Sequence, residues 1–181
     1  GNSINFDTLP GITGIFGRNA RGKSSIIGAL MYCLFNTSDR GTIKNIHVIN
    51  SRKNMCKASV DMSIGGNKYR IARKTIKKST KSGVWAPTSL NFYRLNDNSE
   101  IIEDLSDEQR RSTEVVIRKM IGTADEFLMT SLASQGEMNM FIKEKATARK
   151  AILTKFLDLK VFDKLQEEVK SSSNVLRMKA K

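Results

Sequence analysis

The chain has 181 residues, of which 31 are Lys or Arg and 18 are Asp or Glu, so its net charge is +13. A hydrophobic share of 39% is enough to form a core, which excludes disorder of the whole chain. No apolar run approaches the roughly 20 residues that a bilayer span needs, so we expect no membrane-spanning segment. Two cysteines support neither a disulfide framework nor a zinc site and fit a reducing compartment. The positive charge indicates that the chain binds an anionic partner, which could be nucleic acid, phosphate or an anionic membrane surface.

A phosphate-binding motif lies near the N-terminus. Residues 17–24 match G-x-x-x-x-G-K-[ST], the P-loop, whose backbone N–H groups surround phosphate oxygens. The apolar residues Ile12–Phe16 predict a buried strand before it, and the apolar periodicity of Ser25–Phe35 predicts a helix that ends at Asn36. Lysine would contact the β- and γ-phosphates, and the serine hydroxyl would ligate Mg²⁺. The predicted nucleotide-binding residues are Gly17, Arg18, Asn19, Ala20, Arg21, Gly22, Lys23, Ser24 and Ser25.

The middle of the chain predicts an antiparallel sheet. Lys57–Ile64 alternates apolar and polar residues, a glycine-rich turn follows, and Lys68–Ile76 is the returning strand with Tyr69 and Ile71 facing inward. The polar stretch Lys77–Pro87 predicts an exposed loop. Two further strands are predicted at Leu90–Leu95 and Glu100–Ile102.

This region is also strongly basic. From Met62 to Asn96 the chain has no acidic residue. One interpretation is a surface that contacts the phosphate backbone of DNA, with Trp85 able to stack on a base. The other is a solvated strand face followed by a flexible loop. On the first interpretation the DNA-binding residues are Arg73, Lys74, Lys77, Lys78 and Lys81.

The last third of the chain predicts helices. Ser106 or Asp107 caps a helix that runs to Ile121, Thr123 caps a second short helix, and a third begins near Thr147. In the first of these helices, the apolar positions predict that Val115, Val116, Ile117 and Met120 face the core. From Phe162 the apolar residues at 162, 165, 169 and 176 have roughly coiled-coil spacing, although an ordinary amphipathic terminal helix fits equally. His47 and Cys33 are predicted to be structural residues.

The second motif of most P-loop proteins is missing from the sequence. That motif is a strand of at least four apolar residues that ends in a magnesium-binding Asp. The sequence contains no run of four apolar residues followed by Asp. The chain therefore carries one half of a nucleotide site. We expect the other half to come from a distant or separate segment.

Several segments together resemble one family. Residues 14–25 resemble the P-loop of the SMC-like ATPases of DNA double-strand-break repair, such as the bacterial SbcC type and the ATPase subunit of phage recombination nucleases. Residues 68–71 resemble the second strand of that family's meander. Residues 127–137, which end in Ser134-Gln135-Gly136-Glu137, resemble its Q-loop, and residues 148–162 resemble the segment that leads into its coiled coil.

The resemblance implies an α/β fold: the N-terminal lobe of an ABC/SMC-type ATPase head over residues 1–158, and the start of a coiled coil over residues 159–181. The cofactors would be ATP and Mg²⁺. Gln135 would complete the metal shell with Ser24 and orient the attacking water, which makes Lys23 and Gln135 the catalytic residues. The full-length protein would be an ATPase, whereas this chain alone would bind ATP with little or no hydrolysis.

The resemblance also implies partners. They are the C-terminal lobe of the same protein, a second head in an ATP-dependent homodimer, a nuclease subunit and double-stranded DNA, with no membrane. The location would be the cytoplasm of a bacterial or phage-infected cell, or a eukaryotic nucleus. Two alternatives are an SMC-type structural organiser of DNA and an unrelated P-loop kinase or GTPase. The kinase or GTPase would need its own magnesium-binding Asp and a base-recognition motif, and neither is visible in the sequence.

Overall fold

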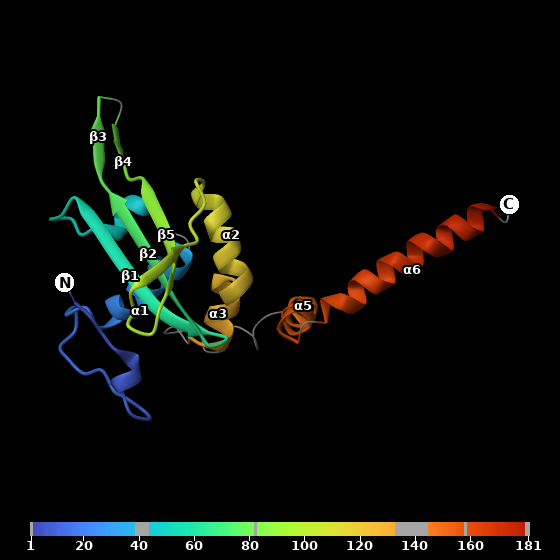
Figure 1. Cartoon of the computed structure of the whole chain (residues 1–181), viewed down its shortest axis with the longest axis horizontal. Helices are drawn as coiled ribbons and strands as arrows, with labels where there is room; N and C mark the ends of the chain where they lie inside the picture. Colours follow the sequence, from blue (N-terminus) through green and yellow to red (C-terminus); the bar gives the residue numbers. More distant parts are fainter. Residues whose placement is uncertain (1, 39–43, 82, 133–144, 158, 180–181) are drawn as a thin grey trace. The chain divides into compact units, whose positions relative to one another are not determined.

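The computed structural model describes residues 2–38, 44–81, 83–132, 145–157 and 159–179 (Figure 1). Contacts divide the chain into two compact units, Gly1–Ile121 and Gly122–Lys181. The first unit combines helices with an antiparallel sheet, which agrees with the predicted α/β lobe. The expected boundary between lobe and coiled coil, after residue 158, stays a prediction.

The main sheet of the first unit is a four-stranded meander. Its strands are β1 (Met55–Ile64), β2 (Asn67–Ile76), β5 (Thr88–Leu95) and β6 (Ile101–Asp104), in the order β1-β2-β5-β6 and all antiparallel. The β1–β2 turn consists of Gly65 and Gly66 with φ of +56° and +78°, the left-handed values that a tight hairpin turn requires. The predicted meander is confirmed.

A second, two-stranded hairpin joins β2 to β5. It consists of β3 (Lys78–Thr80) and β4 (Gly83–Trp85), where the sequence predicted only an exposed loop. Because β2 and β5 pair along their whole length, their ends arrive side by side, and the residues between them continue the pairing. The hairpin side chains are exposed as predicted, and the Lys78 ammonium lies 5.6 Å from the centre of the Trp85 ring.

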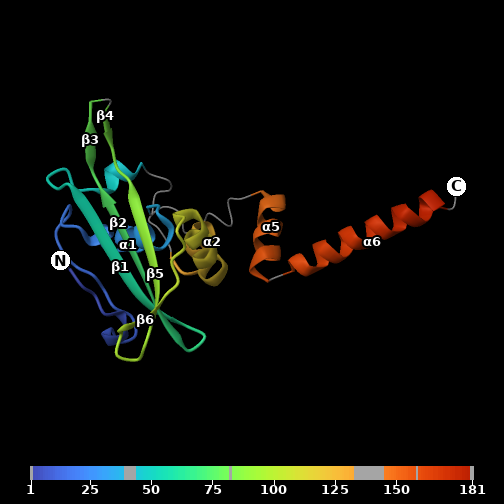
Figure 2. The same ribbon diagram turned by 45° about the horizontal axis from the view of Figure 1, so that its top comes forward.

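Two helices pack on the sheet (Figures 1 and 2). Helix α1 (Lys23–Phe35) contacts β1 and β2, and α2 (Arg110–Ile121) contacts β5. Helix α1 ends at Asn36, a left-handed C-cap residue with φ +56°, which confirms the predicted helix. Two short 3₁₀ helices, η1 (Phe6–Thr8) and η2 (Asn45–Val48), flank α1 in the chain. The apolar residues that form the core are Met31, Tyr32, Cys33, Leu34, Phe35, Ile49, Ile71, Leu90, Phe92, Leu95 and Ile117.

The predicted apolar side of α2 was partly wrong. Val115 and Val116 are 52% and 43% exposed, whereas Thr113 and Ile117 are buried. Residues four apart lie on one side of a helix, so the face that contains Thr113 and Ile117 turns Val115 and Val116 away from the sheet. Ile117 is inward as predicted.

The strand predicted before the P-loop was also wrong. Residues 12–16 are not a strand, and the side chains of Ile12 and Phe16 are fully exposed. A buried strand must exchange backbone hydrogen bonds with neighbouring strands, and the described strands pair only with one another. The apolar run therefore has no partner in the described part of the chain.

The second unit is helical as predicted. Thr123 and Glu126 form a capping box at the start of α3 (Ala124–Thr130), and α5 (Ala146–Phe156) and α6 (Lys160–Lys179) follow. On α6 the side chains of Phe162, Leu165 and Val169 are exposed, which both predicted interpretations of this helix allow, while the side chain at position 176 lies outside the described residues. Among the described helices, none has the length and apolar character that crossing a membrane requires.

Candidate nucleotide site and basic surface

The P-loop leads directly into the first turn of α1. Gly22 is the N-cap residue, with φ +85° and ψ +15°, and its carbonyl oxygen accepts a hydrogen bond from the Ser25 N–H at 3.0 Å. Left-handed backbone of this kind strains any residue with a Cβ, which explains glycine at this position. Residues 17–22 are exposed, so the N-terminal end of α1 faces an accessible loop. A helix N-terminus of this kind attracts anions.

Lys23 folds back over its own loop. Its Nζ donates hydrogen bonds to the carbonyl oxygens of Gly17 at 2.8 Å and of Arg18 at 3.0 Å. The positive charge is therefore held against the loop rather than extended into solvent. A phosphate oxygen is a stronger, charged acceptor than a carbonyl and would hold this ammonium more tightly.

Ala20 has a left-handed backbone within the loop, with φ +61°. An L-residue with a Cβ loses about 1 kcal/mol in this region relative to glycine. Many P-loops have glycine at this position, where the absence of a Cβ removes that loss. Alanine in place of glycine at position 20 therefore puts a strained residue inside the loop.

The residues present fit a bound nucleotide phosphate. A Cβ on Gly17 would approach only the side chain of Lys23, at 3.9 Å, so the loop is open. Ser24, predicted as the magnesium ligand, is exposed in the first turn of α1 beside Lys23. No group of three or more His, Cys, Asp or Glu side chains that could hold a metal exists among the described residues. Gln135 lies outside the described residues, so its predicted place beside Ser24 stays a prediction.

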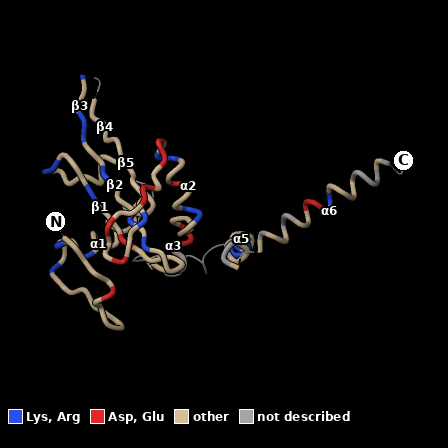
Figure 3. The backbone as a smooth tube through the Cα atoms, viewed as in Figure 1, with Lys and Arg blue, Asp and Glu red and all other residues tan. Residues whose placement is uncertain are grey.

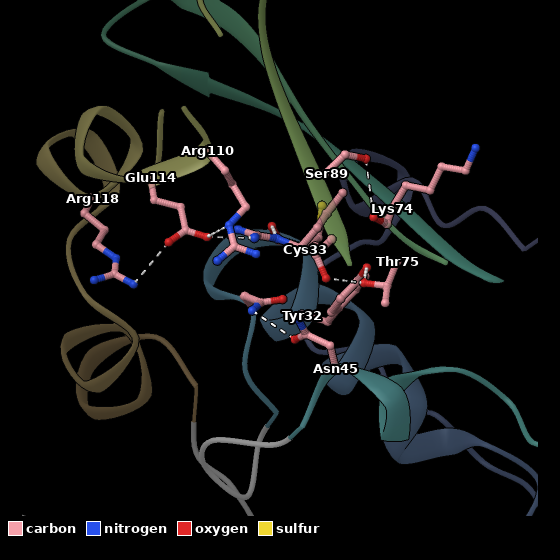
Figure 4. Close-up of polar contacts among 12 residues, drawn as sticks. Tyr32, Cys33, Asn45, Lys74, Thr75, Ser89, Arg110, Glu114 and Arg118 are labelled. Atoms are coloured by element: carbon pink, nitrogen blue, oxygen red, sulfur yellow. Dashed lines mark hydrogen bonds and ion pairs between the residues drawn. The ribbon is translucent and has the colours of Figure 1, made fainter. Parts of the chain in front are cut away.

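The other end of α1 is fixed in the core by polar contacts (Figure 4). The Tyr32 hydroxyl lies 2.7 Å from Oγ1 of Thr75, and the Cys33 thiol donates to the Ile71 carbonyl oxygen at 3.3 Å. Burial raises the pKa of Cys33 to about 11, against the lowering effect of the Arg73 charge, and burial also raises the pKa of Tyr32. Cys33 is thus an inert buried thiol, as predicted.

Arg73 was predicted to contact DNA, and this was wrong. Its side chain is fully buried, where Nε donates to the Cys33 carbonyl oxygen at 3.1 Å and Nη1 donates to Oε1 of Glu114 at 3.0 Å. Successive side chains of a strand point to opposite faces, so Arg73 points toward α1 and α2 while Lys74 points outward. Arg110 and Arg118 also approach the Glu114 carboxylate, at 3.5 and 3.8 Å (Figure 4).

The other predicted DNA-binding lysines lie toward the end of the sheet where β2 ends, and Figure 3 shows basic residues around β3. Lys77 follows β2, Lys78 begins β3 and Lys81 follows β3, and all three are exposed. Lys74 on β2 lies directly opposite Lys57 on β1, a residue that was not among the predicted DNA contacts. The register of the β1–β2 hairpin would have revealed this pair, because the turn at Gly65 and Gly66 determines which residues face each other.

Comparisons with known proteins identify the family of the chain. A family model described as an AAA domain matches residues 1–181. The chain is 29% identical over 162 residues to an uncharacterized protein of Acanthamoeba polyphaga mimivirus, which covers 88% of this chain and 12% of that protein. It is 32% identical over 156 residues to the DNA double-strand break repair Rad50 ATPase of Thermoplasma volcanium, covering 86% of this chain and 16% of that protein.

A third relative is a subunit of the nuclease SbcCD from Clostridium acetobutylicum, 24% identical over 165 residues, covering 88% of this chain and 14% of that relative. The chain therefore spans less than a fifth of the length of these relatives. The predicted resemblance to the SMC-like ATPases of DNA double-strand-break repair is confirmed. With a family model that matches its whole length, this chain belongs to the AAA domain family.

Proposed function

We propose that this chain forms the ATP-binding half of an SMC-like ATPase of DNA double-strand-break repair. The observation that carries the proposal is the P-loop geometry, in which Lys23 Nζ lies against the loop carbonyls at the open N-terminal end of α1. Support comes from the relatives, which include a DNA double-strand break repair Rad50 ATPase and a nuclease subunit.

The proposal assigns separate roles to the loop backbone and to three side chains. The backbone N–H groups of residues 17–25 and the helix N-terminus bind the phosphates. Lys23 leaves the carbonyls of Gly17 and Arg18 and contacts the β- and γ-phosphate oxygens. Ser24 and Gln135 would hold Mg²⁺, which supplies charge neutralisation at the phosphates, and Gln135 would position water.

Other parts of the complete protein would finish the nucleotide site. The relatives are much longer than this chain, so we propose that a C-terminal lobe of the same protein and a second head complete that site. Closure of two heads on ATP would then control a nuclease subunit. Lys57, Lys74, Lys77, Lys78 and Lys81 would contact the backbone of double-stranded DNA without reading its sequence. Such a protein would act in the cytoplasm of a bacterial or phage-infected cell, or in a eukaryotic nucleus.

Calorimetry of the 181-residue chain with ATP and Mg²⁺ tests the proposal. Lys23→Ala removes the cation at the β- and γ-phosphates and should weaken ATP binding at least tenfold, since a charge-assisted phosphate contact contributes roughly 1.5–3 kcal/mol. Lys119→Ala, an exposed lysine of α2, removes the same charge elsewhere and should leave the affinity unchanged. Equal affinities of wild type and Lys23→Ala would contradict the nucleotide site.

A further inference from the structure

A cleft of about 440 Å³ lies beside η2, where β1 begins and β2 ends. Its polar lining consists of His47, Asn50, Ser51, Lys53 and Lys77, and Ile49 forms part of its apolar floor. His47 and Lys53 belong to one stretch, residues 46–53, and Lys77 comes from the segment that follows β2. The P-loop and the Arg73–Glu114 network contribute no residue to the lining.

Hydrogen bonds fix the main chain of the two lysines beside the cleft. The Lys53 N–H donates to the Asn50 carbonyl oxygen at 2.8 Å, and the Arg52 N–H donates to Oδ1 of Asn50 at 2.9 Å, which closes a tight turn. The Lys77 N–H donates to the carbonyl oxygen of Asn54 at 2.8 Å. The two lysines are therefore joined through main-chain contacts, and their positions do not depend on their own side-chain interactions.

The chemistry of the lining selects an anion. It offers two ammonium groups, an imidazole, a hydroxyl and an amide, and it includes no carboxylate among the described residues. Ammonium, N–H and O–H groups are the donors that phosphate oxygens accept from. With two lysines and no carboxylate in the lining, an anion would meet attraction there and no opposing negative charge.

We propose that this cleft is a second phosphate site, separate from the P-loop, which receives a phosphodiester group of the DNA backbone. The inference rests on the DNA contact proposed above and assigns part of it to specific residues. Lys53 and Lys77 pair with the phosphate, and the N–H of His47 and the Ser51 hydroxyl donate to its remaining oxygens.

Continuity with the hairpin favours a backbone phosphate over a free one. Lys77 lines the cleft and directly precedes Lys78 of β3, and Lys81 follows on the same hairpin. Lys57 and Lys74 face each other at the same end of the sheet. A single free phosphate would occupy the cleft alone, whereas a duplex carries successive charges that could contact these lysines together.

The single histidine of the chain provides a local probe. In the 181-residue chain, the imidazole proton resonances of His47 should shift when a short DNA duplex is added. The double variant Lys53→Gln/Lys77→Gln should lose that shift, while Lys119→Gln should keep it. Both lysines of the double variant are exposed, and the Lys77 contact to Asn54 uses the main chain, so a retained dispersion of the amide spectrum should show that the variant is folded.

Inorganic phosphate serves as the second ligand in this titration. It should shift the His47 resonances only at concentrations far above those of the duplex phosphates. Equal shifts at equal phosphate concentrations would overturn the assignment to a nucleic acid backbone. No shift with either ligand would overturn the cleft as an anion site.

Duplex binding by the complete protein with ATP, measured against salt, gives an independent result. The double variant should lower the magnitude of the salt slope by about two, since each lost phosphate contact reduces it by about one. A second variant replaces Lys78 and Lys81 of the hairpin with Gln. A slope that is unchanged in the cleft variant and reduced in the hairpin variant would overturn DNA binding by the cleft and leave DNA binding by the hairpin standing. Unchanged slopes in both variants would overturn both DNA contacts, and the proposed ATP site would still be judged by calorimetry alone.

Discussion

Arg73 on β2 donates a hydrogen bond to Glu114 on α2 at 3.0 Å, and its guanidinium is fully buried beneath both helices. The same side chain donates to the carbonyl oxygen of Cys33 in the last turn of α1, where a positive charge also complements the helix dipole. Arg73 therefore connects the P-loop helix, the sheet and α2 through one side chain. Its residual Nη2 has no hydrogen-bond partner among the described residues, so the Glu114 carboxylate is the main compensation for a buried charge.

We expect Glu114→Ala to destabilise the fold by about 3–5 kcal/mol, because it leaves the Arg73 charge buried and uncompensated. Arg110→Ala is the matched control, since Arg110 approaches the same carboxylate from a partly exposed position and should cost less than about 1 kcal/mol. Urea unfolding of the chain measures both. Similar costs for the two variants would show that Arg73 does not depend on Glu114.

We expect Ala20→Gly to stabilise the fold by up to about 1 kcal/mol. The structure already holds residue 20 in a left-handed backbone, so glycine relieves the folded chain of this strain whether or not ATP is bound, and ATP affinity should change little. Urea unfolding measures the change, and Ala29→Gly, inside α1, should instead destabilise the fold because it places glycine in a helix interior. A loss of stability in Ala20→Gly would mean that residue 20 does not adopt this conformation.

Stability should fall at alkaline pH because of Cys33. Burial raises the pKa of its thiol to about 11, whereas an unfolded cysteine titrates at a pKa near 8.5. Between these values the unfolded chain loses the proton that the folded chain keeps. The stabilisation is therefore complete below about pH 8.5 and is lost at up to about 1.4 kcal/mol per pH unit as the pH rises toward 11.

Urea unfolding of the wild type and of Cys33→Ala tests whether Cys33 causes this loss of stability. The measurements are made at about pH 7.5, 9 and 10, which lie on either side of the unfolded pKa. The variant should be less stable at the lowest of these pH values and should lose less of its stability on going to the highest. Burial also raises the pKa of Tyr32, which acts in the same direction and is present in both proteins. Parallel pH profiles for the two proteins would exclude Cys33 as the source of the loss.

Lys57→Thr should stabilise the chain and weaken DNA binding. Lys57 and Lys74 lie directly opposite each other on β1 and β2, and like charges at such positions destabilise a sheet by a few tenths of a kcal/mol. Lys57→Thr in a Lys74→Thr background controls for β propensity, because residue 57 then faces no charge and the gain should be smaller. The gain from Lys57→Thr in the wild-type background should shrink in about 0.5 M salt, which screens the repulsion. If Lys57→Thr left duplex affinity unchanged, the pair would be a solvated strand feature with no part in the DNA contact.

The chain alone should bind ATP and hydrolyse it at close to the background rate. It carries the phosphate loop, Lys23, Ser24 and Gln135, while its sequence shows no apolar run that ends in a magnesium-binding Asp. The proposed C-terminal lobe added in trans should restore turnover, and Gln135→Ala should then lower turnover far more than ATP affinity, because a water-positioning group acts chiefly in the transition state. Phosphate release by the chain alone at the rate of complete ATPases would favour the kinase or GTPase alternative.

Local patterns in the sequence determined the P-loop and most of the helices and strands. The motif at residues 17–24, the alternation of β1 and the capping residues Asn36 and Thr123 act within a few residues of chain, so their consequences are readable without the fold. The family followed from several such motifs in order. The residues around Gln135 lie outside the described part of the chain, so its role stays a prediction from sequence.

The tertiary structure decided what depends on partners far away in the chain. Charge alone could not separate Arg73, which is buried against Glu114, from its neighbour Lys74, which faces outward; burial depends on which face of β2 the helices cover. Likewise, the apolar residues Ile12–Phe16 read as a buried strand, yet a strand needs neighbours that donate and accept its hydrogen bonds, and none of the described strands pairs with it. Lys53 and Lys77 carry no motif in the sequence, and they face one cleft only because antiparallel pairing brings the start of β1 to the end of β2.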